Sequence, residues 1–264
     1  MGLLERRFQR QRLRILLHML HIIYNLTIDI KINLKIYMGP RTNSLLADLP
    51  EAELQAMVSQ MRLVALQKGQ TLFRAGEEPS HVYFPTGAIV SMMNDNLEGE
   101  ALETFMLGRT CMVGVGTLGQ PSFYRAQVRS SGLAYQMPVH ALQRLRTECP
   151  QYLHNAQAAV NRMLMHLMQT IACSKRHPVE QQLIRWMLVT LDRTLEPNIQ
   201  ITHQELAEIL GFRREAITLN LKKMSLRQEI VVHRGLIEVL DRAALEQRVC
   251  ECYRIGQQSP GPQA

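Results

Sequence analysis

Cysteine is scarce in this 264-residue chain, and its spacing excludes several classes of protein. The five cysteines include no CxxC pair; they are Cys111, Cys149, Cys173, Cys250 and Cys252. An odd number of cysteines without paired spacing argues against the disulfide framework of a secreted protein and favours a reducing compartment. We therefore expect a cytoplasmic protein, and we interpret Cys250-x-Cys252 as ordinary thiols on a terminal helix, with no metal site. Metal binding or oxidant sensing by this pair is the alternative.

The apolar segment near the N-terminus lacks the features of a membrane span. The run ILLHMLHIIYNLTIDI is broken by His18, His21 and Asn25, and no small-residue cleavage site follows it. It is too short and too polar to cross a membrane, and the interruptions and the missing cleavage site argue against a signal peptide. We interpret residues 1–37 as an upstream extension before an ordinary-looking start at Met38. A basic amphipathic segment that touches membrane or nucleic acid is the alternative.

The net positive charge is also small outside this extension. The net charge is +7, but residues 1–38 contain seven Lys or Arg and only two Asp or Glu. The extension therefore carries five of the seven net positive charges, and overall basicity says little about nucleic-acid binding by the rest of the chain.

The most informative stretch is ITHQELAEILGFRREAITLNLKKM, residues 201–224, which is typical of two short helices joined by a tight turn. Thr202 and Glu205 have the spacing of a capping box, and Gly211 suits the left-handed conformation of the turn. Apolar residues at helical spacing leave an outer face near the start of the second helix; its members are Arg213, Arg214, Glu215 and Thr218. In a helix-turn-helix this end lies in the major groove, where Arg recognises guanine and Glu recognises cytosine. A helical hairpin that merely carries charge on its exposed face is the alternative.

Two β-branched runs follow, EIVVH and LIEVL, on either side of Arg234-Gly235. This pattern predicts a hairpin and so the wing of a winged helix. The basic tip at His233-Arg234 would contact phosphates, which position a protein on DNA without reading its sequence.

Residues 62–137 consist of short β-type runs separated by glycine, which predicts a β-sandwich or roll. The runs are RLVAL, TLF, HVYFP, AIVSMM, ALETFML, AQVRS and LAYQM. We expect residues 44–61 to form one amphipathic helix before them. The only histidine in the roll is His81, and no His-x-His pair is present, so a metal enzyme of the cupin type is not expected. We expect no enzymatic activity.

A long helix is predicted to begin at Pro150. Leu153, Val160 and Leu167 recur every seven residues, with Leu164 and Ile171 on the adjoining line. This heptad pattern predicts a coiled-coil seam and hence a homodimer, which suits a two-fold DNA site. Packing of the helix on its own domain is the alternative. After the wing, DRAALEQRVCECYRI is predicted to form one closing helix.

We therefore expect an α+β protein with a double-stranded β-helix (jelly-roll), a long dimerisation helix and a C-terminal winged helix-turn-helix. The predicted division is an extension at 1–37, a β-roll sensor domain at 38–149, a dimerisation helix at 150–177, a DNA-binding domain at 178–255 and a disordered tail at 256–264.

This order of parts, from about residue 44 to residue 248, resembles the cyclic-AMP receptor protein / fumarate-nitrate reductase regulator (Crp/Fnr) superfamily of bacterial transcription factors. The resemblance is strongest in ITHQELAEILGFRREAI, which follows the family motif I-T-x-Q-E-(L/I)-…-G-…-R-E-(T/A)-(V/I). It implies phosphate contacts for Thr202 and Gln204 and base contacts for Arg214 and Glu215. Leu219 stands where some members have a further base-reading Arg, and Asn220 where an apolar packing residue is usual.

The roll departs from the cyclic-nucleotide-binding members of that family. Their Gly-Glu-(Leu/Met) and Arg-(Ser/Thr)-Ala motifs, which bind ribose and cyclic phosphate, correspond here to Gly114-Val115-Gly116 and Tyr124-Arg125-Ala126. Val115 cannot accept a hydrogen bond, and a shift of one residue in a strand would point Arg125 to the other face. The long helix has Leu167 and Met168 where the cyclic-AMP-binding members have a polar pair. We therefore expect an effector other than cyclic AMP, because a buried phosphate needs a cationic or N–H partner.

Other cofactors have little support from the sequence. No cysteine precedes Cys111, so the N-terminal iron–sulfur cluster of the family's oxygen sensors is not expected. The histidines that could ligate haem have no distinctive setting; they are His81, His140, His154 and His166. We expect no cofactor.

The sequence thus predicts a homodimeric regulator that binds a pseudo-palindromic site in double-stranded DNA, with RNA polymerase as a further partner. Two alternatives stay open. One is a cyclic-nucleotide-responsive regulator, and the other is a ligand-binding or interaction module whose winged helix contacts protein instead of DNA.

Overall fold

The computed structural model describes residues 39–96, 101–114, 120–193 and 198–257. The predicted extension at 1–37 lies outside these residues. Of the tail predicted at 256–264, the first two residues belong to a helix, Cys252–Gln257, so disorder was wrong for them, and residues 258–264 lie outside the described part. The N-terminal domain contains two antiparallel sheets, ordered β1-β7-β3 and β2-β6-β4-β5. Their strands are β1 (Arg62–Leu66), β2 (Thr71–Phe73), β3 (His81–Pro85), β4 (Ile89–Asp95), β5 (Ala101–Leu107), β6 (Arg125–Ser130) and β7 (Gly132–Pro138). Each strand lies within a residue or two of a run predicted from the sequence.

The two sheets pack face to face around one core. Side chains alternate along β6, where Ala126 and Val128 point inward and their neighbours are half-buried. They meet residues of the other sheet, including Leu66, Tyr83 and Ala134. Because both sheets contribute to this cluster, the domain is the predicted β-roll, and the α+β fold class is confirmed.

Short helices cover the outer face of the β1-β7-β3 sheet. They are the 3₁₀ turn η1 (Pro40–Thr42), α2 (Ser44–Ala47), α3 (Glu51–Val58) and α4 (Val139–Leu145). The prediction of a single helix over residues 44–61 is wrong. Pro50 is extended (φ −50°, ψ 145°) and caps α3, and a proline disfavours helical geometry in the residue before it, so the chain breaks between α2 and α3.

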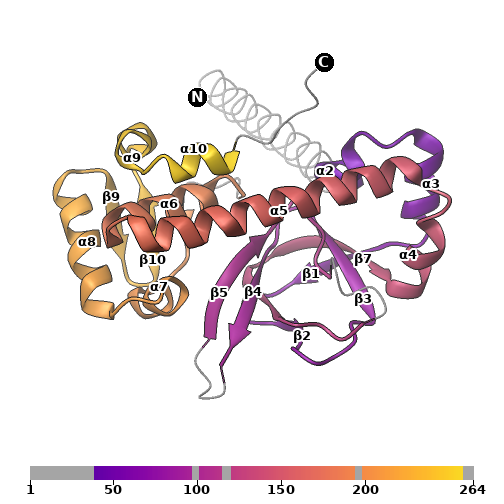
Figure 1. Ribbon diagram of the computed structural model, residues 1–264, viewed down its shortest axis with the longest axis horizontal. Coiled ribbons are helices and arrows are strands. Elements are labelled where there is room, and N and C mark those ends of the chain that lie inside the picture. The colour runs from indigo at the N-terminus through magenta and orange to yellow at the C-terminus, as the bar shows by residue number, and fades with distance from the viewer. Residues whose placement is uncertain (1–38, 97–100, 115–119, 194–197, 258–264) are drawn as a thin grey trace, which may run out of the picture.

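The 27-residue helix α5 (Pro150–Arg176) runs from the roll to the C-terminal domain (Figure 1). At 1.5 Å per residue it is about 40 Å long. Leu167 and Met163 pack against the roll core, so Leu167 does not belong to an exposed seam as predicted. The other predicted seam residues are exposed on α5, and Met168 joins them; the exposed apolar line comprises Leu153, Val160, Leu164, Met168 and Ile171.

The C-terminal domain has the predicted winged-helix arrangement. Its elements are α6 (Val179–Leu191), β8 (Asn198–Ile199), α7 (His203–Leu210), α8 (Arg214–Leu226), β9 (Ile230–His233), β10 (Leu236–Val239), α9 (Arg242–Arg248) and α10 (Cys252–Gln257). The single closing helix predicted after the wing is wrong, because Val249 is extended (φ −66°, ψ 149°) and separates α9 from α10. Figure 1 shows α10 lying along α5, and the two helices are in contact.

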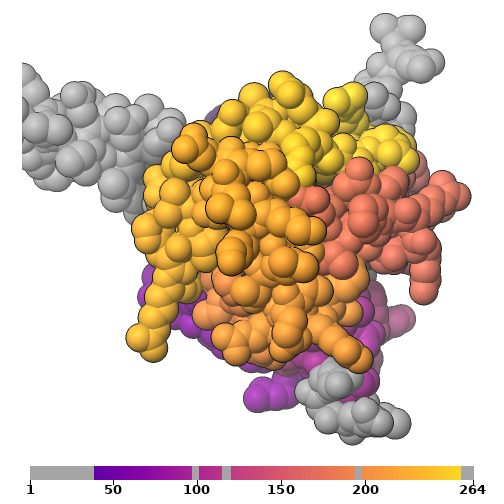
Figure 2. Space-filling view, turned by 90° about the vertical axis from the view of Figure 1, so that its left-hand side faces the viewer, coloured from indigo at the N-terminus to yellow at the C-terminus, as the bar shows by residue number. Residues whose placement is uncertain are grey.

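The winged helix packs directly on the roll (Figure 2, with the winged-helix region in orange and yellow and the N-terminal region in purple). Ile89 and Met106 of the roll are buried in the same cluster as the winged-helix core. Trp186 Nε1 donates to Glu103 Oε1 across this contact at 3.1 Å. Within the described part of the chain, no helix is both long and apolar enough to cross a membrane.

A close approach of two turns in the roll generates a test of this fold. A Cβ atom on Gly132 would lie 2.5 Å from the backbone of Gly87 and Ala88, whereas a Cβ atom on Gly87 would meet Leu133 N at an ordinary 3.8 Å. Gly132→Ala should destabilise the protein by about 1–3 kcal/mol through overpacking, whereas Gly87→Ala should change stability little. Thermal or urea unfolding of both variants measures the difference, and equal stability would contradict this packing.

Candidate nucleic-acid interface

The start of α7 is held by the predicted capping box. Thr202 Oγ1 accepts the N–H of Glu205 at 3.1 Å, and Glu205 Oε2 accepts the N–H of Thr202 at 2.7 Å. At the other end Gly211 has φ 69°, the left-handed conformation predicted for the turn. Both local predictions are confirmed, and together they fix how α7 enters and leaves the helix pair.

The second helix, α8, places its charged residues outward. Ile217 and Leu221 are buried on one side of it. Arg213 is the N-cap residue, and the outer face of the first turns is exposed; it comprises Arg214, Glu215 and Thr218. This face combines cations and a carboxylate at a helix N-terminus, the groups that can read base edges or contact phosphates.

The cations of this surface are not neutralised. Arg213, Arg214 and Arg234 form no ion pair with another described residue. The same holds for Lys222 and Lys223, which are exposed farther along α8. We did not single out these lysines from the sequence, although Lys222 lies four residues after Thr218 and therefore on its face of the helix. This helical spacing could have identified Lys222 from the sequence.

Two side-chain contacts organise the surface between α7 and α8. His203 Nδ1 and Thr218 Oγ1 are 2.9 Å apart, so Thr218 is tied to the start of the preceding helix. Burial and the nearby charge of Arg214 lower the pKa of His203. Gln204 is exposed and donates to Glu208 Oε1 at 2.8 Å. The sequence placed Gln204 and Thr218 on this surface but did not show the contact with His203.

The wing lies next to the helix pair. Strands β9 and β10 pair antiparallel and are joined by Arg234 and Gly235, and Gly235 has φ 77°. A Cβ atom on Gly235 would lie 4.0 Å from Thr202 Cγ2, so the wing turn abuts the start of α7. Arg234 is exposed at the tip, whereas His233 Nε2 lies 3.8 Å from Glu238 Oε2. The wing thus adds one unpaired cation to the surface.

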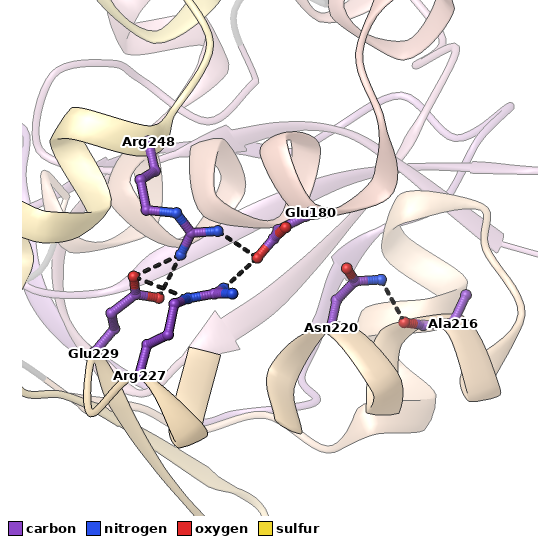
Figure 3. A network of polar contacts seen from close by, with 6 residues as sticks. All are labelled: Glu180, Ala216, Asn220, Arg227, Glu229 and Arg248. Carbon is purple, nitrogen blue, oxygen red and sulfur yellow. Dashed lines mark hydrogen bonds and ion pairs between the residues drawn. The ribbon is translucent and has the colours of Figure 1, made fainter. Parts of the chain in front are cut away.

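A network of four charged side chains supports the far end of α8 (Figure 3). Arg248 donates to both Glu229 and Glu180, and Arg227 bridges the same two carboxylates. This network of charged side chains connects α6, α8 and α9. Its member Glu229 is buried. Nearby, Asn220 donates to the Ala216 carbonyl at 2.8 Å, which satisfies its amide within α8 in place of the apolar contact that is usual there (Figure 3).

The surface also borders the roll. A hollow of about 1200 Å³ separates the start of α8 from the β4–β5 hairpin. Its lining includes Gln204, Arg213, Arg214 and Glu215 on one side and Asn94, Asn96 and Leu102 on the other. The structure thus brings four of the predicted DNA-contacting residues together, at the edge of the roll.

Glu205 connects the two domains at this edge. Besides capping α7, its Oε1 lies 3.3 Å from Lys68 Nζ and 3.6 Å from Arg129 Nη1, both in the roll. Burial raises the pKa of Glu205, but the hydrogen bonds from Thr202 and the charges of Arg129 and Lys68 outweigh burial and lower the pKa below its ordinary value.

The roll positions expected to correspond to a cyclic-nucleotide site have other partners. Val115 lies outside the described residues. Tyr124 is buried, and its hydroxyl accepts the N–H of Gly114 at 3.2 Å. Arg125 lies on the opposite side of the strand, where it forms a bidentate ion pair with Asp95 at 2.6 and 2.7 Å. On α5, Met168 is exposed.

Residues able to ligate a metal gather away from this surface. Among the described residues they form two overlapping groups near the end of α5, Cys173 with Cys250 and Cys252, and Cys252 with His177 and Glu251. Sequence spacing could not show that Cys173 belongs with the other two thiols.

Comparisons with known proteins support the assignment of both domains. Residues 63–149 match the cyclic nucleotide-binding domain, and residues 181–248 match the Crp-like helix-turn-helix domain. The chain is 22% identical over 199 residues to the global nitrogen regulator of Synechococcus elongatus, covering 71% of this chain and 90% of that protein.

Solved structures show the same fold at low identity. A CRP-family transcriptional regulator from Thermus thermophilus has a TM-score of 0.60 at 17% identity, over 70% of this chain and 95% of that one. FixK2 from Bradyrhizobium japonicum has a TM-score of 0.61 at 13% identity, over 72% of this chain and 98% of that one.

The two roles of Glu205 can be separated by mutation. Glu205→Gln keeps a side chain that completes the capping box but removes both ion pairs, so we expect a loss of about 0.5–1 kcal/mol at neutral pH. A carboxylate whose pKa is lowered by folding stabilises the protein above its unfolded pKa, near 4.5, and this stabilisation is lost as the pH falls through the folded pKa. Unfolding measured from pH 7 to pH 3 should therefore show a shallower loss for the variant than for the wild type.

The control is Glu208→Gln, which changes an exposed acid one turn farther along α7 that forms no ion pair with the described residues. Identical pH profiles for wild type and Glu205→Gln would contradict the proposed contribution of these ion pairs.

Proposed function

The chain belongs to the Crp/Fnr family of transcription regulators, and on this basis we propose that it acts as a homodimer on pseudo-palindromic DNA in response to an effector other than cyclic AMP. Its helix-turn-helix domain is of the DNA-binding Crp type, and the relatives named above are regulators. The homodimer, the site residues and the effector are our own inferences, supported as follows.

The observation that carries the proposal is the exposed end of α8. Arg213 and Arg214 have no acidic partner among the described residues, and Glu215 is exposed beside them. Leaving two arginines unpaired at a helix N-terminus has no stabilising effect on the fold, since the helix dipole is itself positive there. In a major groove these side chains have partners, because Arg donates two hydrogen bonds to guanine and Glu accepts one from cytosine.

The remaining predicted residues suit phosphate contacts. The Thr202 hydroxyl accepts a backbone N–H in the cap, so its own hydrogen stays available as a donor to a phosphate oxygen. Gln204 and Thr218 are exposed beside it, and Arg234 extends from the wing. We add Lys222, which continues the face of Thr218 along α8. Such contacts set affinity and orientation, whereas the first turn of α8 sets specificity.

The exposed line on α5 supports the homodimer. Leu164, Met168 and Ile171 are between 55% and 64% exposed, although all three are apolar. With Leu153 and Val160 they repeat at intervals of three, four or seven residues, the spacing of a helix-packing seam. A second copy of α5 is the natural partner because a two-fold axis along this line pairs each apolar residue with its equivalent. The same axis would give two reading helices for two half-sites.

The contacts in the roll argue against cyclic AMP. The Gly114 N–H, a potential phosphate donor, is bonded to the Tyr124 hydroxyl, and the Arg125 guanidinium is neutralised by Asp95. A cyclic phosphate would have to break these contacts or stay without a cationic partner, which is costly in a buried site. We therefore propose that another effector acts on the roll and shifts the population of dimer arrangements that bind DNA. RNA polymerase is the second macromolecular partner that we propose.

Selection of duplexes from a random DNA library by the full chain, with and without cyclic AMP, tests this function. We expect one palindromic consensus, enriched equally in both conditions. Enrichment only with cyclic AMP would contradict our interpretation of Tyr124 and Arg125. A protein whose winged helix contacts protein would enrich no duplex.

On the selected site, Arg214→Ala should weaken binding by about 1–3 kcal/mol, roughly 5- to 150-fold, and relax the preference at one base pair. The matched control is Lys222→Ala, which should weaken binding to all sequences alike and reduce the salt dependence by about one phosphate contact. Equal weakening of all sequences by Arg214→Ala would show that this arginine contacts only phosphate.

The dimer is tested by placing a charge on the α5 line. Leu164→Glu should give a monomer in analytical ultracentrifugation, because two carboxylates would face each other in an apolar seam. Gln169→Glu is the control, since five residues place it about 140° around the helix from Leu164. If the Leu164 variant stays dimeric, the interface lies elsewhere.

A further inference from the structure

Three of the five cysteines meet where the long helix ends. Cys173 is in the last turn of α5, and Cys250 and Cys252 flank the start of α10. All three thiols are buried and lie within 4.8 Å of one another, and the Sγ atoms of Cys173 and Cys250 are 3.6 Å apart. Four tetrahedral ligands around zinc, with Zn–S bonds of about 2.3 Å, would place sulfur atoms about 3.8 Å apart. The cluster therefore has nearly the spacing of a metal site.

The break between α9 and α10 makes this arrangement possible. In a continuous helix, residues two apart point about 200° away from each other, so Cys250 and Cys252 could not both face Cys173. The extended backbone at Val249 turns the chain, and both thiols become buried against α5. As a result, the thiols of Cys250 and Cys252 both lie close to the thiol of Cys173.

A histidine completes a possible ligand set. His177 follows Cys173 by four residues and caps α5, so both lie on one side of the helix end. A ring nitrogen of His177 lies within 4.8 Å of Cys252 Sγ, in the second metal-ligating group, which contains Glu251 but neither Cys173 nor Cys250. Its Nε2 is 3.4 Å from Glu251 Oε1 and is buried without a hydrogen bond. His177 Nδ1 is 3.0 Å from Gln181 Oε1. With this oxygen as acceptor, Nδ1 carries a proton, so a neutral ring has its lone pair on Nε2, the tautomer of a metal-ligating histidine. To bind a metal held by the three thiols, Nε2 would turn from Glu251 toward them.

A buried arginine beside the thiols lacks a counter-ion. Arg185 is only 6% exposed and lines the same cavity as Cys173. Its Nη2 donates to Thr170 Oγ1 at 3.0 Å, but its Nε has no partner, and no carboxylate in the described part of the chain pairs with it. An unpaired buried charge is costly. Three neutral thiols do not offset it, whereas an anionic centre would.

We propose that Cys173, Cys250 and Cys252 bind one zinc ion, that His177 turns from Glu251 to supply the fourth ligand, and that Arg185 is the counter-charge. A divalent ion held by three thiolates and a neutral imidazole carries one net negative charge, which matches the single positive charge of Arg185. Thiolate and imidazole are the ligands that structural zinc sites use, and four protein ligands leave no open position for chemistry. A cavity of about 290 Å³, lined by Cys173 and Arg185 among others, provides an approach to the site.

A zinc ion bound at this site would connect the C-terminal helices α9 and α10 to the end of α5. Cys173 and His177 belong to the end of α5, whereas Cys250 and Cys252 follow the wing, so one ion would connect segments 77 residues apart. Because the unfolded chain holds no such arrangement, zinc bound there stabilises the folded state.

Metal content of the wild-type full chain tests the proposal without any variant. After purification under reducing conditions and removal of loosely bound metal, we expect one zinc ion per chain by elemental analysis. The metal-free chain titrated with Co²⁺ should develop thiolate-to-cobalt charge-transfer absorption and the visible bands of a tetrahedral ion. Absence of both results, or a Cys173–Cys250 disulfide found by mass spectrometry in the metal-free chain as purified, would overturn the proposal.

Variants then assign the ligands. Cys173→Ser and Cys250→Ser should each abolish stoichiometric zinc, whereas Cys149→Ser, at an equally buried thiol in the roll, should retain it. Arg185→Met should lower zinc affinity about 10- to 100-fold in chelator competition, as for other outer-shell partners, and Arg185→Lys should recover part of it. Full zinc retention in the Cys173→Ser, Cys250→Ser double variant would place the metal elsewhere.

Discussion

The carboxylate of Glu205 connects the local structure of the helix pair to the arrangement of the two domains. One of its oxygens accepts the Thr202 N–H at the start of α7, and the other faces Lys68 and Arg129 of the roll. The same side chain thus sets the entry of α7 and the position of the reading helix relative to the roll. Partly exposed ion pairs are worth at most about 1 kcal/mol each. An effector with modest differential affinity could therefore shift the winged helix relative to the roll, even though apolar residues of both domains share a core.

The two sides of helix α5 differ in what they contact. Met163 and Leu167 complete the roll core, while Leu164 and Met168, one residue farther along, are exposed. Adjacent helical residues lie about 100° apart, so a single helix can be part of its own domain and still present an apolar line to a second copy. A movement of the roll core against α5 would also displace the exposed apolar line, because both sets of side chains are on the same helix. The end of the same helix carries Cys173, so the proposed zinc site would join the winged helix to the element that connects both domains.

In the roll, the described positions expected to correspond to a cyclic-nucleotide site have other partners. Tyr124 is buried in the core that Ala126 and Val128 continue, and its hydroxyl uses the Gly114 N–H, while Arg125 turns to Asp95 on the other side of the strand. The match to a cyclic nucleotide-binding domain agrees with the packing of the two sheets, and an effector other than cyclic AMP is our proposal. Packing is determined by the alternation of apolar residues, whereas ligand choice depends on a few polar groups, and these are paired with one another here.

The sequence alone determined the local structure, because strands, caps and turns depend on residues close together in the chain. The seven strands of the roll, the capping box at Thr202, the turn at Gly211 and the wing at Arg234-Gly235 follow from periodicity and turn chemistry. The break at Pro50 is also local, because proline disfavours helical geometry in the residue before it, although our prediction missed it. Tertiary structure decided the rest. The burial of Leu167 against the roll and the meeting of Cys173 with Cys250 depend on where distant segments pack. A one-dimensional pattern gives each residue a side of its helix or strand, but only the packed chain shows what lies opposite.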